Sequence, residues 1–185
     1  MGGRTAVLRA ALRNPSARRV LAAFFLFNTQ EYGIWVAVVI YAYARGGATT
    51  AGLVLLAQLV PAMFFAPLAS VLGDRMQRGR ALLLGYSTQA MAAAALAAAL
   101  AWAPPPLAYL AAVISAALVS LTRPVHNAIL PELAATPDEL TAANAASGAM
   151  EAVGNFVGPL VISIVIGPGG VALGVGVMAV LMARA

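Results

Sequence analysis

The chain contains no cysteine and no lysine, and it has a single histidine. The absence of cysteine excludes disulfides and thiolate metal sites. No H-E-x-x-H, G-x-S-x-G or Walker sequence occurs, so we expect neither an enzyme nor a cofactor or metal site. The net charge of +5 comes from arginines that lie beside apolar runs rather than on one exposed face, which argues against a nucleic-acid partner.

Charge is scarce and apolar residues dominate. Hydrophobic residues make up 62% of the 185 residues, charged residues make up 9%, and the mean hydropathy is +0.90. Such a chain cannot hide its apolar surface in one small soluble core. A helix needs about 20 mainly apolar residues to cross a bilayer, and several runs reach that length. The composition predicts an all-α transmembrane protein with the lipid bilayer as its main solvent.

Glycine, proline and charged residues divide the apolar part of the chain into six predicted helices. These helices span 20–44, 51–72, 81–102, 107–130, 137–166 and 170–183. Residues 1–19 form a basic N-terminal tail. The first apolar run is too long for the hydrophobic region of a signal peptide, so we take it as a retained helix.

Local sequence predicts where two helices begin. Asn14 followed by Pro15 offers an N-cap and a proline at the first helical position. Thr136, Pro137 and Glu139 combine the same proline with a capping box. The fifth helix therefore begins before its apolar part.

The arginines predict the orientation of the chain. With a cytoplasmic N-terminus, ten of the eleven arginines fall on or near the inner side and only Arg45 falls outside. Positive charge is enriched in cytoplasmic loops, so we expect a multi-pass protein with a cytoplasmic N-terminus.

The loop GDRMQRGR, residues 73–80, resembles the signature loop of the major facilitator superfamily, which reads roughly G-x-x-x-D-R-x-x-R-[RK]. The residues that carry the resemblance are Asp74, Arg75, Arg78 and Arg80. Ser70 and Gly79 differ from the family pattern. In that family the loop latches one six-helix half against the other, so the resemblance implies an inner-loop latch here.

Arg123 is a further candidate for this inner latch. It stands near the inner end of the fourth predicted helix, where it could neutralise a carboxylate. We expect it to pair with Asp74 or with Glu151.

Two further stretches resemble the same family. Residues 122–133 and 140–146 resemble the junction of helices four and five in a bacterial exporter branch. Gly154, Gly158 and Pro159 match the G-x-x-x-G-P core of a helix-five motif of proton-coupled antiporters. The resemblance implies the N-terminal half of a twelve-helix transporter in the bacterial inner membrane. It implies export of a small organic molecule, such as a drug or siderophore, in exchange for protons.

Polar side chains inside the predicted helices are candidates for the substrate and proton pathway, because a charged group in lipid costs a few kcal/mol. On three helices they share a face by the helical period. They are Asn28, Glu31, Tyr32 and Trp35; Ser115, Thr122 and His126; and Asn144, Ser147, Glu151 and Asn155. Glu31 and Glu151 are the candidate proton or cation carriers. The alternative is a packed polar cluster, and for the glycines we favour helix packing over ligand contact.

Several interpretations remain open. The expected partners are lipid, a small organic substrate, protons, and a missing C-terminal six-helix half or a second copy of the chain. The alternatives are a non-transporting membrane scaffold or sensor, and an uptake permease that differs only in direction.

Overall fold

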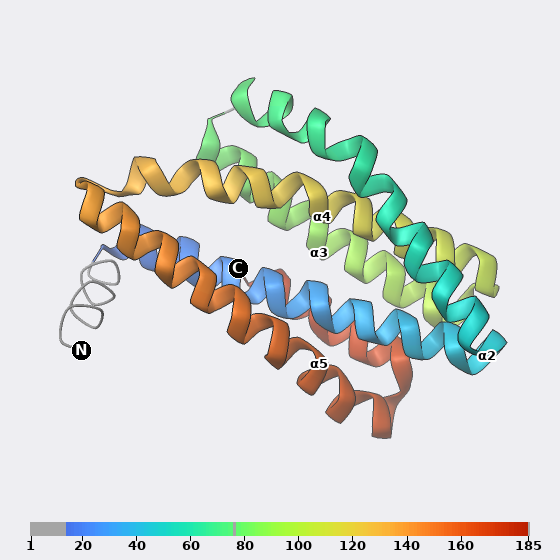
Figure 1. The fold of residues 1–185 in the computed structure, drawn as a ribbon. Coiled ribbons are helices and arrows are strands. Elements are labelled where there is room, and N and C mark those ends of the chain that lie inside the picture. The colour runs from blue at the N-terminus through green and yellow to red at the C-terminus, as the bar shows by residue number, and fades with distance from the viewer. Residues whose placement is uncertain (1–13, 76, 185) are drawn as a thin grey trace.

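A computed structural model describes residues 14–75 and 77–184, with side chains except at 62, 65–75, 121, 168 and 169. Its elements are α2 (Pro15–Arg75), α3 (Arg78–Trp102), α4 (Pro105–Leu133) and α5 (Pro137–Met182). Figure 1 shows them as a bundle of long helices. The part of the chain that the structure describes contains no strand, which confirms the predicted all-α fold.

Two of the elements are broken by glycines. In α2 the helix is interrupted at Gly46 and at Gly47, which has a φ of 66°. In α5 it is interrupted at Gly170, which has a φ of 75°. Positive φ is accessible to glycine without steric cost, so the chain can turn back at these points. Each of the two elements therefore consists of two helical segments that run in different directions (Figure 1).

The two predicted helix starts are confirmed. The Asn14 side-chain oxygen accepts hydrogen bonds from the backbone N–H groups of Ser16 and Ala17, at 3.0 and 3.4 Å. At the start of α5 the backbone N–H of Glu139 donates to the Thr136 hydroxyl at 3.2 Å. The Glu139 carboxylate reaches back to the N–H of Ala135 at 2.7 Å, one residue beyond the position of a standard capping box.

Replacing Asn14 by alanine is expected to lower the free energy of unfolding by about 1 kcal/mol, the typical value of an N-cap. Asn14→Ser should keep most of the stability, because serine also caps helices. Thermal unfolding in detergent, followed by circular dichroism, checks both variants. Equal unfolding temperatures for the wild type and Asn14→Ala would contradict the capping role.

The helices run back and forth between two ends of the bundle. The break at Gly46–Gly47 and the connection between α3 and α4 lie at one end (Figure 1). The start of α2, the connection between α2 and α3, and the turn between α4 and α5 lie at the other. There the Asn14 amide donates to the carbonyl of Leu133 at 3.1 Å, so the start of α2 is tied to the end of α4.

Two apolar clusters fill the interior. The first includes Phe24, Phe27 and Leu82, near the start of α2. The second is built on later residues of α2, such as Val38, and includes Leu96. Between the two clusters, α2 carries the run from Asn28 to Glu31, of which Asn28, Thr29 and Gln30 are buried. The fold therefore places a polar layer between two apolar cores.

The outer surface is largely apolar. Exposed large hydrophobic residues occur on every helix, among them Met63 and Phe156, which are 76% and 72% exposed.

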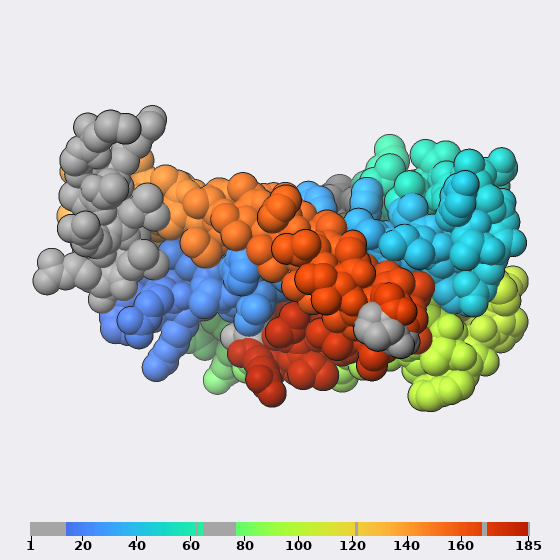
Figure 2. All heavy atoms as spheres, turned by 90° about the horizontal axis from the view of Figure 1, so that it is seen from below, coloured from blue at the N-terminus to red at the C-terminus, as the bar shows by residue number. Residues whose placement is uncertain are grey.

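 In Figure 2, the face seen from below is formed mainly by α5 and by parts of α2. Within the residues that the structure describes, four helices are long and apolar enough to cross a membrane: Pro15–Pro61, Arg78–Trp102, Pro105–Leu133 and Pro137–Gly167, with Gly170–Met182 as a shorter apolar helix. Large apolar side chains on the outside suit a lipid environment.

Candidate functional site

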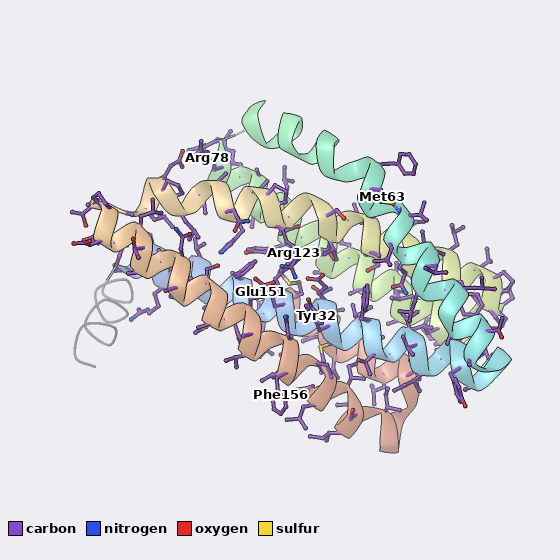
Figure 3. All side chains as sticks on the ribbon, in the orientation of Figure 1. Tyr32, Met63, Arg78, Arg123, Glu151 and Phe156 are labelled. Atoms are coloured by element: carbon purple, nitrogen blue, oxygen red, sulfur yellow. The ribbon has the colours of Figure 1, made fainter. Side chains whose placement is uncertain are left out.

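One arginine joins three helices in the middle of the bundle. Arg123 on α4 donates from Nη2 to the Glu31 carboxylate on α2 at 2.7 Å, and from Nη1 to the Glu151 carboxylate on α5 at 2.8 Å. Nη2 also donates to the Asn28 side-chain oxygen at 3.0 Å. We call Asn28, Glu31, Arg123 and Glu151 the Arg123 cluster, and Figure 3 shows Arg123 and Glu151 between the helices.

The Arg123 cluster carries one arginine against two carboxylates, so its formal charge is −1 when all three groups are ionised. The side chains of Glu31, Arg123 and Glu151 are 16%, 29% and 38% exposed. Charged groups that are largely or partly buried in this way are stabilised by pairing and hydrogen bonding. A guanidinium can meet two carboxylates at once because its donors are arranged as a planar fork.

Local packing holds the members of the cluster in place. The Asn28 amide donates to the carbonyl of Phe24 at 2.7 Å, which leaves its oxygen free to accept from Arg123. The guanidinium carbon of Arg123 lies 5.7 Å from the centre of the Phe27 ring, within cation–π range. The first apolar cluster therefore supports the arginine from one side.

A second polar contact joins α4 to α5. His126 Nε2 lies 2.8 Å from the Ser147 hydroxyl, and the His126 ring stacks on Phe24 with centroids 3.6 Å apart. The other ring nitrogen, Nδ1, is buried without a partner among the described residues. His126 is fully buried, so it belongs to the interior of the bundle rather than to its surface.

A pocket of about 130 Å³ opens beside the cluster. It is bounded by both helical segments of α2, by α3 and by α4. Its polar lining residues are Gln30, Glu31, Gln58, Gln89, Ser115 and Ser120. Trp35, Leu59 and several small or aliphatic side chains complete the wall. Glu31 therefore belongs both to the Arg123 cluster and to the pocket.

Glycines let α2 and α5 approach closely next to the cluster. A Cβ atom on Gly154 would lie 2.8 Å from the Asn28 Cβ, and one on Gly158 would meet the Thr29 carbonyl oxygen. A Cβ atom on Gly33 would lie 3.1 Å from the Gly158 carbonyl oxygen. Small residues allow this kind of close helix contact in lipid. Both glycines of the G-x-x-x-G-P motif, Gly154 and Gly158, therefore lie at the crossing of α2 and α5.

The structure brings most of the predicted pathway residues to this region, but not all of them. Trp35 and Ser115 line the pocket, and Thr122 is buried. Tyr32 is half-buried on α2 and does not line the pocket. Two further predicted pathway residues lie on α5. Asn144 is exposed, whereas Asn155 has a buried side-chain oxygen without a partner among the described residues.

The predicted latch residues divide into separate groups. The side chains of Asp74 and Arg75 lie outside the described residues. Arg78 forms an ion pair with Glu132 at 2.9 Å and donates to the carbonyl of Ala128 at 2.6 Å, so the start of α3 is tied to the end of α4. Arg80 is exposed.

Arg123, which the sequence groups with the inner loop, lies instead in the Arg123 cluster. Of its two expected partners, the structure pairs it with Glu151, and it adds Glu31 as a second carboxylate. The reason is geometric, because α2 packs against both α4 and α5, and the Arg123 side chain on α4 reaches a carboxylate on each of the other two helices.

Sequence reasoning missed two of the three glutamines of the pocket, Gln30 and Gln58. Gln30, Gln58 and Gln89 are 2%, 3% and 1% exposed, so each is an amide inside the bundle. One feature of the sequence could have identified them. Each is an uncharged polar residue inside an apolar helix, and burying such a side chain in lipid costs free energy unless it has a hydrogen-bond partner.

Comparison with protein families gives an independent result. The model of the family described as Major Facilitator Superfamily matches residues 20–184. Searches of curated proteins and of solved structures returned no match. The match covers every described helix almost completely and agrees with the long apolar helices of the fold. The chain therefore belongs to the major facilitator superfamily, and it is a multi-pass membrane protein of a family that transports small solutes.

Proposed function

We propose that the chain is the N-terminal half of a proton-coupled exporter of small organic molecules. The observation that carries this proposal is the Arg123 cluster, in which one arginine holds carboxylates from two different helices. The proposed location is the bacterial inner membrane, with the N-terminus in the cytoplasm, because ten of the eleven arginines then fall on or near the inner side.

Proton coupling follows from the charge of the cluster. A single proton on Glu31 or Glu151 would bring the formal charge of the three groups from −1 to zero. It would also weaken the attraction of Arg123 for the protonated partner. Since Glu31 is on α2 and Glu151 is on α5, the choice of partner changes which helix is held by α4. Protonation can therefore shift the population of two arrangements of these helices, as alternating access requires.

The transporter needs a second helical half in this proposal. That half is either a further part of a longer chain or a second copy of this one. The loop residues Asp74, Arg75, Arg78 and Arg80 would form the inner latch between the halves. The ion pair of Arg78 with Glu132 supports this role, because it holds the loop next to the end of α4.

Replacing Glu31 by glutamine is expected to abolish transport driven by a pH gradient while the protein is still produced. The amide can still accept a hydrogen bond from Arg123, and Arg123 remains paired with Glu151, so no buried charge is left alone. The measurement is uptake of ethidium into inside-out membrane vesicles from cells that produce the protein, after an imposed pH jump.

Asp138→Asn is the matched control, because it makes the same change from acid to amide at an exposed position in the first turn of α5. It should transport like the wild type. Unchanged transport by Glu31→Gln would remove Glu31 from the coupling mechanism. Uptake with the opposite gradient dependence would show an uptake permease, and a wild type that moves no probe under any gradient would favour a scaffold or sensor.

A further inference from the structure

The pocket beside Glu31 is built from buried polar groups. Gln30, Gln58, Gln89 and Ser115 all line it, and each is at least 97% buried. They come from α2, α3 and α4, and Gln30 and Gln58 lie on the two different segments of α2. The volume of about 130 Å³ has room for about four water molecules, since each takes roughly 30 Å³. That is the size of a small polar group with a few heavy atoms.

The hydrogen bonds of the glutamines leave two side-chain oxygens without a donor among the described residues. The Gln30 amide N–H donates to the Gln89 carbonyl oxygen at 3.2 Å, and the Gln58 amide N–H donates to the Val54 carbonyl oxygen at 3.4 Å. No hydrogen bond to the side-chain oxygen of Gln30 or Gln58 occurs among the described residues. The Gln89 side-chain nitrogen is the one pocket donor that is buried without a partner in the described part of the chain.

A backbone carbonyl adds to these acceptors. Pro124 has no N–H and so cannot donate to the carbonyl of Ser120, four residues earlier in α4. Ser120 is one of the residues that line the pocket. Besides the Gln89 side-chain nitrogen, a ligand in the pocket can therefore meet the acceptor oxygens of Gln30 and Gln58.

The charge around the pocket also favours a cationic ligand. Glu31 lines the pocket, whereas Arg123 does not. Arg123 is already shared between two carboxylates, so the three ionised groups leave one negative charge without a counter-charge. Trp35 in the wall offers an aromatic face, which attracts cations.

We propose that this pocket binds the ammonium group of a small organic amine, with the apolar part of the amine passing out over Trp35 and Leu59. An ammonium group supplies up to three N–H donors for the oxygens of Gln30, Gln58 and Glu31, and one positive charge to balance the negative charge of the cluster. The inference rests on the proposed function in that the amine would be the head group of the transported molecule.

Binding can be measured on the pocket itself, without transport. The chain has two tryptophans, and Trp102 is 85% exposed at the end of α3, so Trp102→Phe leaves Trp35 as the only indole fluorophore. This variant, purified in lipid nanodiscs, is titrated with 2-phenylethylamine, with its N,N,N-trimethyl derivative and with neutral 2-phenylethanol. We expect a saturable change in Trp35 emission with the amine. The apparent Kd should be at least tenfold weaker for the alcohol, which lacks the charge, and also for the trimethyl derivative, which lacks N–H donors.

Gln58→Met in the same background removes one acceptor and keeps the length of the side chain. Its bond to Val54 lies within one helix, so the fold should survive. We expect the Kd for 2-phenylethylamine to rise about tenfold, as for the loss of a hydrogen bond to a charged group. Ser163→Ala is the matched control, because Ser163 is exposed and bonds only within α5 to the carbonyl of Pro159 at 2.7 Å.

Equal affinity for the amine and the alcohol would overturn the proposal, and so would an unchanged Kd in Gln58→Met. Failure of the pocket is distinguishable from failure of the proposed function. Ethidium transport without amine binding would overturn the pocket alone. Saturable amine binding that depends on Gln58, in a protein that transports nothing, would support the pocket and overturn the exporter.

Discussion

Replacing Arg123 by methionine is expected to lower the free energy of unfolding by about 3 kcal/mol. This is the low end of the range for breaking a buried ion pair, because Glu151 is 38% exposed and keeps part of its hydration. Methionine fills a similar space, so most of the loss comes from the carboxylates of Glu31 and Glu151, which are left without a counter-charge. Thermal unfolding in detergent measures the effect, and pH-driven ethidium uptake should be lost.

A charge-free version of the same cluster provides the control. Combining Arg123→Met with Glu31→Gln and Glu151→Gln removes all three charges, and it should recover most of the stability because no unpaired charge remains. The recovered protein should still fail to transport ethidium, since it has no carboxylate at either position to take up a proton. If Arg123→Met alone unfolds at the wild-type temperature, the arginine does not hold the helices together.

Replacing Gly158 by alanine is expected to cost up to about 3 kcal/mol, the usual upper value for overpacking a close contact. The added Cβ would meet the Thr29 carbonyl oxygen and lie 2.8 Å from the Gly33 nitrogen. Both are backbone atoms of α2, so the contact can be relieved only if α2 and α5 move apart. Such a movement would also stretch the bonds from Arg123 to Glu31 and Glu151.

Gly148→Ala, earlier in α5, is the matched control. Nothing lies within 4 Å of its added Cβ, and alanine is favoured over glycine in a helix by about 0.5–1 kcal/mol. This variant should therefore be as stable as the wild type or slightly more stable. Opposite shifts of the unfolding temperature in the two variants would support the packing role of Gly158, and equal shifts would contradict it.

The helical fold could be predicted from local sequence alone. Apolar runs of membrane-spanning length predict long helices, and the structure contains them. Asn14 and Thr136 mark helix starts through bonds to residues two or three positions away. The breaks in α2 and α5 fall at Gly47 and Gly170, inside glycine-rich sequences. All of these features depend on neighbours in the chain, which is why the sequence contains enough information to predict them.

The Arg123 cluster shows where such prediction stops. The cost of a charge in lipid singles out Glu31 and Glu151 as unusual residues, but it does not say which cation they meet. The sequence left Arg123 with two possible acidic partners, and the structure pairs it with Glu151 and with Glu31, 92 residues away. That choice depends on how α2 packs against both α4 and α5, which brings the three side chains together.

Sequence by itself determined that this protein is a bundle of apolar helices of the major facilitator superfamily, because length, hydropathy and motif order are properties of contiguous residues. Only the tertiary structure decided which buried polar groups meet. The pocket draws Gln30, Gln58 and Gln89 from three helical segments, and no pattern along the chain relates them. The physical reason is that their positions follow from helix crossings, which the close contact of Gly154 and Gly158 with α2 allows.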